Sequence, residues 1–203
     1  MTTAGLDEAG RGPILGPMVL CGVSFEERDL PRLREAGVRD SKLLSPQRRE
    51  KLAEVIGEIA VSVELVELQA QQIDELRKSK NLNEIEAEIF ARIINNLNPS
   101  SAYVDSPDPD PHLFEQRLRR YLKKSPRLVV ENGADRKYVQ ASAASILAKQ
   151  RREERVKELH EKYGDFGSGY LTDPRTISFL RKWIREHGEL PDFARKSWKL
   201  KLR

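Results

Sequence analysis

The chain has 203 residues, close to the size of one domain, and its composition of 38% hydrophobic and 33% charged residues allows a buried core under a charged surface. No apolar run approaches the roughly 20 residues that cross a bilayer, and the first residues lack the basic-then-apolar pattern of a signal peptide. The single cysteine, Cys21, excludes an internal disulfide framework and a cysteine-type zinc site, so we expect a protein of the reducing cytoplasm.

Basic residues gather in the last part of the sequence. The net charge is only +4, but nine Lys and Arg stand against three Asp and Glu between Arg175 and Arg203. Such a run is typical of a solvated helical face or of a surface that binds a polyanion, and the pattern leaves both open. We predict a main domain of residues 1–174, followed by a small basic region of short helices at residues 175–203.

The first half of the chain predicts a hairpin, a helix and a third strand. Two apolar stretches flank a segment rich in Gly and Pro, which forces turns, so they should pair as a hairpin with an elaborate connection. Ser45-Pro46 is a typical helix start, because proline suits the first helical position. The expected elements are strands at residues 3–6 and 18–25, a helix at 47–59 and a strand at 61–65.

The second half alternates helices and strands. Apolar residues from Leu82 to Leu97 recur at helical spacing, and Pro99 ends that amphipathic helix. Further on, we expect strands at residues 102–104 and 127–130, a helix ending near 123, and one long helix at 138–163. Strands alternating with helices predict an α/β layer structure.

Four acids occupy positions where such a structure places functional groups. Asp7 and Glu8 follow the first strand, Asp105 ends another strand, and Asp135 precedes the long helix. Carboxylates that meet in one place repel one another, and a pair of Mg²⁺ or Mn²⁺ ions would resolve this. Each acid alone is more typical of a solvated loop residue or a helix cap, and Asp135 in particular could simply cap the next helix. The three histidines are scattered, which argues against a histidine zinc site.

Five ordered sequence blocks carry a resemblance to a known family. They resemble ribonuclease HII, especially its archaeal branch, and the similarity runs from about Gly5 to Trp198. The blocks are Asp7-Glu8-Ala9-Gly10-Arg11-Gly12-Pro13, Asp40-Ser41-Lys42, Tyr103-Val104-Asp105-Ser106-Pro107-Asp108, Ala134-Asp135-Arg136-Lys137-Tyr138 and Gly164-Asp165-Phe166-Gly167-Ser168-Gly169-Tyr170.

The resemblance implies a fold and a reaction. The fold would be ribonuclease H-like, a mixed five-stranded sheet flanked by helices, with a small C-terminal helical region. Asp7, Glu8, Asp105 and Asp135 would hold two Mg²⁺ or Mn²⁺ ions, with Asp7 shared between them. The enzyme would cut the RNA strand of RNA/DNA hybrids and nick DNA on the 5′ side of embedded ribonucleotides, leaving 5′-phosphate and 3′-hydroxyl ends. Its role would lie in ribonucleotide excision repair and RNA primer removal.

The resemblance also implies substrate-binding residues. Backbone amides of the Gly10-Arg11-Gly12 turn would meet the 2′-hydroxyl, and the Tyr170 ring would stack on the neighbouring sugar. Without the family, a solvated Arg11 and a core-packed Tyr170 would be the simpler reading. The residues expected to contact phosphates, which give affinity without sequence preference, are Lys42, Lys149, Arg195, Lys196 and Lys199.

Two departures from the family pattern limit these expectations. The stretch Glu131-Asn132-Gly133 stands where relatives commonly carry a histidine and a lysine, so the contacts around Asp135 should differ from those of the family. The residues after Trp198 lack the glutamine-plus-aromatic motif of clamp-binding relatives, so a sliding-clamp partnership is unsupported, and we expect a monomer. The alternatives are another nuclease of the same fold, such as an exonuclease or resolvase, or a catalytically silent nucleic-acid-binding module.

Overall fold

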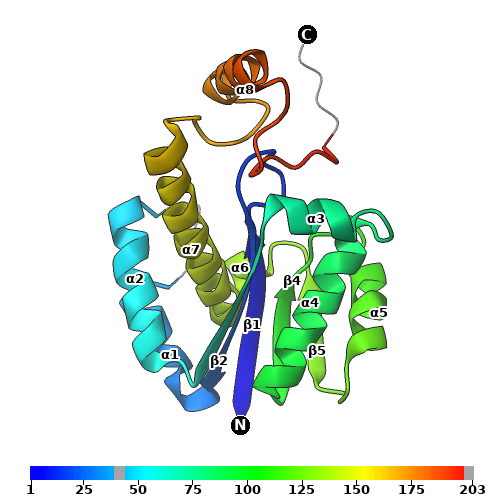
Figure 1. Ribbon diagram of the computed structural model, residues 1–203. Coiled ribbons are helices and arrows are strands. Elements are labelled where there is room, and N and C mark those ends of the chain that lie inside the picture. The colour runs from blue at the N-terminus through cyan, green and yellow to red at the C-terminus, as the bar shows by residue number, and fades with distance from the viewer. Residues whose placement is uncertain (39–43, 199–203) are drawn as a thin grey trace.

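A computed structural model describes residues 1–38 and 44–198 and shows a central sheet with helices on both sides (Figure 1). The elements in chain order are β1 (Thr2–Ala9), β2 (Met18–Glu26), η1 (Glu27–Asp29), α1 (Leu30–Ala36), α2 (Pro46–Ile59), β3 (Ser62–Leu68), α3 (Ala70–Leu76), α4 (Leu82–Leu97), β4 (Ser101–Asp105), α5 (Pro111–Tyr121), β5 (Arg127–Glu131), α6 (Ala134–Lys137), α7 (Val139–Tyr163) and α8 (Pro174–His187).

The sheet is mixed, with β1 at its centre. Its five strands lie in the order β3-β2-β1-β4-β5. β1 pairs antiparallel with β2, as the predicted hairpin requires, and parallel with β4 on its other edge. The expectation of a mixed five-stranded sheet flanked by helices is therefore confirmed.

The two faces of β1 contact different helices because side chains alternate along a strand. Ala4 and Leu6 belong to the core cluster that includes α4 and α5, whereas Ala9 belongs to the cluster that includes α2 and α7. Gly5 lets α7 approach closely, since a Cβ at this position would overlap the backbone of Gln140. A residue on β1 thus faces α4 or α7 according to its place in the alternation.

The first strand is longer than the sequence pattern indicates. The prediction ended it at Leu6, but β1 continues through Asp7 and Glu8 to Ala9, paired with β2 along its whole length. Polar side chains interrupted the apolar pattern there, although the backbone hydrogen-bonding continues. The two acids therefore lie inside the sheet rather than in the turn that follows it.

The C-terminal region also differs from the prediction of several short helices. Within the described residues after 174, α8 is the one helix, and the chain beyond it is irregular up to Trp198. A third core cluster joins Leu180 and Ala194 of this region to Ile14 and Leu15 of the turn after β1. The division at residue 174 stays a prediction.

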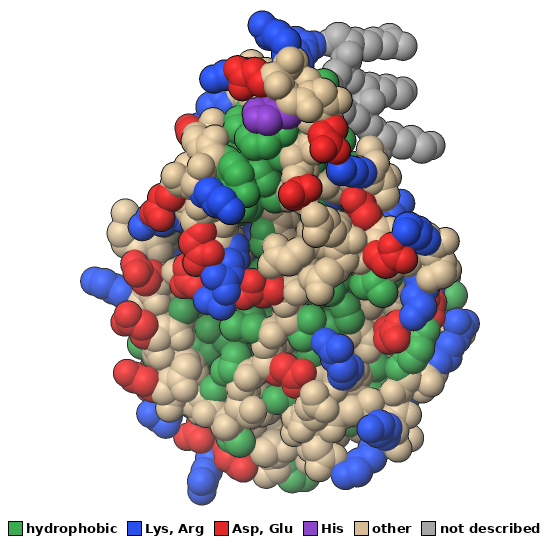
Figure 2. Space-filling view, in the orientation of Figure 1, with side chains coloured by type: hydrophobic (Ala, Val, Ile, Leu, Met, Phe, Trp, Pro, Cys, Tyr) green, Lys and Arg blue, Asp and Glu red, His purple; other side chains and the backbone are tan. Residues whose placement is uncertain are grey.

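Figure 2 shows acidic and basic side chains interspersed over one face, with hydrophobic side chains visible both near the α8 end and across the middle of the face. Among the described residues, no helix has the length and apolar character needed to cross a membrane.

Candidate active site

Three acids from distant parts of the chain meet at one end of the sheet. Carboxylate oxygens of Asp7, Asp105 and Asp135 all lie within 4.8 Å of one another. The parallel pairing explains the first two, because Leu6 lies opposite Val104 and the acids are the next residues on β1 and β4. Asp135 joins them from α6.

Asp105 also stabilises the turn that precedes Asp135. Its Oδ1 accepts hydrogen bonds from the backbone N–H of Gly133 (2.7 Å) and of Ala134 (3.1 Å). Asn132, where the sequence departs from the family, donates to the carbonyl oxygens of Ser106 (3.0 Å) and Asp108 (2.7 Å). This asparagine therefore ties the chain before Asp135 to the chain after β4.

Asp135 is not a helix cap. It is 3% exposed and lies within α6, and Tyr138 holds the N-cap position of α7. Within the described part of the chain, its buried Oδ1 has no hydrogen-bond partner. An uncompensated buried carboxylate oxygen is costly, and a cation would relieve that cost.

Glu8 lies on the opposite side of β1 from Asp7, as strand alternation requires. Asp7 accepts a hydrogen bond from Ser145 of α7, and Lys149 lies nearby. The strongest charged neighbours of Glu8 are Glu86 of α4 and Arg11. Glu8 lines the same cleft as the three converging aspartates without joining their close group.

The acids are hard to ionise together. Burial, helped by Glu8 and Asp105, raises the pKa of Asp7 well above its ordinary value. Burial, with Glu86 beside it, raises the pKa of Glu8 to about 8. Hard divalent cations prefer such oxygen ligands and favour their ionised forms, so the residues present fit Mg²⁺ or Mn²⁺.

A cleft of about 320 Å³ opens beside these acids. The Gly10-Arg11-Gly12 turn and Tyr170 line it together with the acids. Tyr170 is 42% exposed rather than packed in the core, and a Cβ on Gly12 would lie 3.0 Å from its ring. The ring can therefore contact a ligand in the cleft.

The Arg11 side chain is only partly exposed and is held by polar contacts to α4, so it is not simply solvated. It forms an ion pair with Glu86, which is 0% exposed, and donates to Asn83 Oδ1 (2.5 Å). Asn83 in turn donates to Asp108 (2.5 Å). This polar network holds Arg11 against α4.

The predicted phosphate-binding residues are placed differently from one another. Lys149 lines the cleft, and its Nζ donates to Ser145 Oγ (2.9 Å). Lys196 is exposed and pairs with Glu189 (3.3 Å) outside the cleft lining. Lys42 and Lys199 lie outside the described residues.

Arg195 does not fit the predicted contact with phosphate. Its side chain is 0% exposed, and its guanidinium donates to the carbonyl oxygens of Gly10 (2.5 Å), Arg11 (2.8 Å) and Gly16 (3.1 Å). A group enclosed in this way cannot reach a phosphate on the surface. The run of basic residues near the C-terminus had suggested a charged surface, but Arg195 is buried and has a structural role.

Sequence reasoning missed two residues of the site. Glu86 falls in line with Leu82, Ile89 and Ile93 on the apolar face of α4, and an acid in that stripe was the available signal. Arg152 follows Lys149 by three residues on α7, so both face the cleft. Burial lowers the pKa of Arg152, and its Nε and Nη2 have no hydrogen-bond partner among the described residues.

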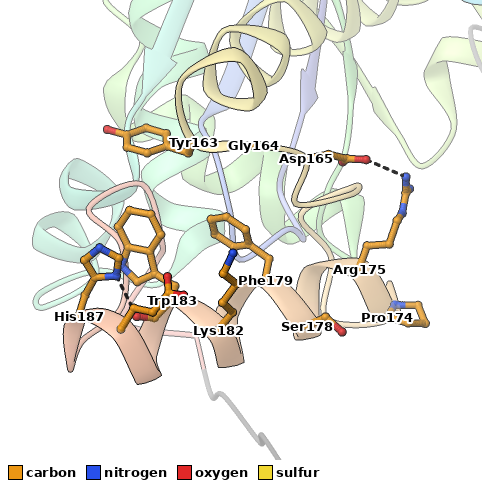
Figure 3. A pocket seen from close by; sticks show the side chains of 11 residues that line it. Tyr163, Gly164, Asp165, Pro174, Arg175, Ser178, Phe179, Lys182, Trp183 and His187 are labelled. Carbon is orange, nitrogen blue, oxygen red and sulfur yellow. Dashed lines mark hydrogen bonds and ion pairs between the residues drawn. The ribbon is translucent and has the colours of Figure 1, made fainter.

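A larger cavity, of about 630 Å³, lies between the end of α7 and α8 (Figure 3). Tyr163, Phe179 and Trp183 line it, and Trp183 stacks on His187 with ring centroids 4.1 Å apart. None of the predicted site residues lies in its wall. Size alone therefore does not identify the active site here.

Comparisons with known proteins identify the family of the chain. The family model of ribonuclease HII matches residues 4–201. Ribonuclease HII of Thermofilum pendens is 50% identical over 202 residues, covering 96% of this chain and 95% of that protein. Ribonuclease HII of Archaeoglobus fulgidus is 47% identical over 198 residues, covering 97% and 93%.

Solved structures show the same fold. The ribonuclease H2 of Pyrococcus horikoshii superposes with a TM-score of 0.92 at 40% identity, covering 98% of this chain and 94% of that one. The A. fulgidus enzyme, solved as a PCNA:RNase HII complex, gives a TM-score of 0.90 at 45% identity, covering 99% and 96%. The chain belongs to the ribonuclease HII family and is a ribonuclease H, an endonuclease of RNA/DNA hybrids.

Proposed function

We propose that this enzyme nicks DNA on the 5′ side of embedded ribonucleotides, in addition to cutting RNA/DNA hybrids, by two-metal-ion catalysis. The observation that carries the proposal is the convergence of Asp7, Asp105 and Asp135 within 4.8 Å, beside a glycine-flanked turn and an accessible tyrosine. The products would carry 5′-phosphate and 3′-hydroxyl ends. Such incision would serve ribonucleotide excision repair and RNA primer removal.

The acids would have different roles in binding the ions. Asp7 has both Glu8 and Asp105 as charged neighbours and belongs to the close group with Asp105 and Asp135, so it would be the residue shared by two ions. Bound Mg²⁺ or Mn²⁺ would lower the pKa of a water molecule and offset charge on the phosphate. Lys149, hydrogen-bonded through Ser145 to the same carboxylate, would help to keep Asp7 ionised.

Recognition of the ribonucleotide would come from the turn and the tyrosine. Backbone N–H groups of Arg11 and Gly12 can approach a sugar closely because glycines flank the arginine. The Tyr170 ring lies against Gly12 of this turn and lines the same cleft, so it can stack on the adjacent sugar. A 2′-hydroxyl is the group that separates RNA from DNA at one position.

Backbone phosphates would be held by cations of the cleft wall. Lys149 and Arg152 face the cleft from the same side of α7, and Lys196, exposed outside the cleft lining, would add a contact farther along the duplex. Contacts of this kind weaken with added salt. Lys42 remains a candidate for the same role.

The expectations about partner proteins, oligomeric state and cellular location stay predictions. The A. fulgidus relative was solved as a PCNA:RNase HII complex, so a sliding clamp is a partner to test for this chain. We expect a cytoplasmic monomer. Light scattering with and without a purified clamp measures the oligomeric state and clamp binding.

A duplex with one embedded ribonucleotide, assayed with Mg²⁺, tests the proposal. We expect a single incision 5′ of the ribonucleotide, whereas an exonuclease would shorten the strand from its end and a silent module would bind without cutting. Asp7→Asn should abolish incision and leave duplex binding largely intact. Asp192→Asn, at an exposed aspartate outside the cleft, is the matched control. Comparable loss of binding in Asp7→Asn would contradict a metal-holding role.

A further inference from the structure

The chain that follows α8 is fastened to the turn that follows β1. Residues 193–198 are called the C-terminal brace below, and the first three of them run antiparallel to residues 14–16, with Leu15 bridged to Ala194. Gly16 N–H donates to the carbonyl of Phe193 (2.9 Å), and Arg195 N–H donates to the carbonyl of Ile14 (2.9 Å). Two segments about as far apart in sequence as the chain allows therefore form one unit.

Arg195 connects this unit to the Gly10-Arg11-Gly12 turn, which we propose contacts the ribose. Its planar guanidinium donates to the carbonyl oxygens of Gly10 and Arg11 from two nitrogens and also reaches Gly16. Arginine is suited to such a task because its donors form a rigid fork. Full burial of a charged side chain requires compensation, and carbonyl oxygens of the turn supply it here.

These contacts fix the direction of the amides that follow. In a trans peptide the C=O and the next N–H point to opposite sides, and the described chain contains no cis peptide. When the carbonyls of Gly10 and Arg11 point at Arg195, the N–H groups of Arg11 and Gly12 must point away from it. Within the described residues, neither N–H has an acceptor in the protein. Both residues line the cleft, whereas Arg195 is outside its lining.

Trp198, at the C-terminal end of the brace, also binds the Gly10-Arg11-Gly12 turn. Its Nε1–H donates to the carbonyl of Gly12 (3.1 Å), and its ring centroid lies 4.9 Å from the Arg195 guanidinium carbon. Asp74 of α3 anchors the brace by accepting from the backbone N–H of Lys196 (2.7 Å) and of Ser197 (2.9 Å). The carbonyls of Gly10, Arg11 and Gly12 are thus all held by the brace.

We propose that Arg195 and Trp198 are positioning residues for ribose recognition, holding the carbonyl side of the Gly10-Arg11-Gly12 turn so that its amides face the substrate. This inference rests on the proposed ribonucleotide-sensing function. It predicts that loosening the brace lowers discrimination between ribose and deoxyribose. Affinity for plain DNA, which depends on phosphate contacts elsewhere, should change little.

Two conservative variants test the inference. Arg195→Lys keeps the positive charge but loses the planar fork, and Trp198→Phe keeps an aromatic ring but loses the Nε1–H that donates to Gly12. Each is combined with Asp7→Asn so that binding is measured without cleavage. The measured quantity is the ratio of dissociation constants for an all-DNA duplex and the same duplex with one ribonucleotide.

We expect that ratio to fall about tenfold in Arg195→Lys and about threefold in Trp198→Phe, in line with the partial loss of one or two hydrogen bonds. The matched controls are Arg185→Lys and Trp183→Phe in α8, which should keep the full ratio. Thermal unfolding of every variant separates misfolding from loss of recognition. If Arg195→Lys does not fold, Trp198→Phe alone decides.

The outcomes separate the inference from the function on which it rests. Folded variants that keep the wild-type ratio would overturn the positioning role, while incision by the wild-type chain would still support the proposed function. Equal weakening on both duplexes would also overturn it, because that pattern indicates a general structural effect. A wild-type chain that neither incises nor prefers ribonucleotide-bearing DNA would refute the proposed function itself.

Discussion

The buried acids should make the metal-free protein lose stability as the pH rises. Burial beside Glu86 raises the pKa of Glu8 from 4.5 to about 8, and the pKa of Glu86 is likewise raised to about 8 by its own burial. A folded-state pKa above the unfolded value means that the folded form holds more protons between the two values. Stability from these groups is therefore complete below pH 4.5 and is lost as the pH rises toward 8.

The size of the effect follows from the shift of Glu8. Each pKa unit corresponds to about 1.4 kcal/mol, and Glu8 is partly open to solvent, so we take about half of the full value, ~2 kcal/mol. For a chain of this length, that loss lowers the melting temperature by about 4–8 °C. Carboxylates with lowered pKa values, such as Asp108 and Asp173, act with the opposite sign, but only at more acidic pH.

Thermal unfolding in EDTA from pH 5 to pH 8 measures this decline, and added Mg²⁺ should reverse more of it at pH 8 than at pH 5. Glu8→Gln should flatten the decline, whereas Glu54→Gln, at an exposed glutamate of α2, should not. A melting temperature that stays level or rises with pH in EDTA would refute the reasoning. So would an unchanged slope in Glu8→Gln.

Three further substitutions have defined outcomes. Tyr170→Ala should reduce incision at single ribonucleotides more than cleavage of long hybrids, and equal losses in kcat/KM would contradict stacking on the sugar. Arg11→Met should destabilise the fold by about 3 kcal/mol in urea unfolding at pH 9, where Glu86, whose pKa is about 8, is ionised and loses its partner. The double variant Arg11→Met/Glu86→Leu should recover most of this, and additive losses would argue against the pair. Gly10→Ala should cost about 1–2 kcal/mol because Gly10 has a φ of +82°, and a wild-type melting temperature would exclude strain there.

Regular elements with a strong apolar rhythm were predictable from the sequence. The helix expected at residues 82–97 is α4 with the same bounds, because its apolar stripe repeats every turn and Pro99 stops it. The long helix differs by one residue at its start. Short elements such as α1 and α3 were missed, since one or two turns contain too few residues to establish a period.

Local pattern fails where long-range contacts decide. Nothing near Arg195 in the sequence distinguishes it from the solvated basic residues around it, because its partners are carbonyl oxygens about 180 positions earlier. Glu86 is similar, since its partner Arg11 lies 75 residues away. The sequence analysis expected four acids to converge; the structure brings Asp7, Asp105 and Asp135 together and leaves Glu8 outside their close group. The expectation came from family motifs, and strand ends alone left other readings open.

The position of Asp7 and Asp105 on adjacent strands ties metal affinity to folding itself. The two residues are neighbours only when β1 and β4 pair in the correct register, and about a hundred residues of chain separate them in sequence. A slip of one residue would turn either carboxylate to the other face of the sheet. Tight binding of a divalent ion should therefore emerge only after the sheet has closed, so metal uptake during refolding reports the assembly of the protein's centre.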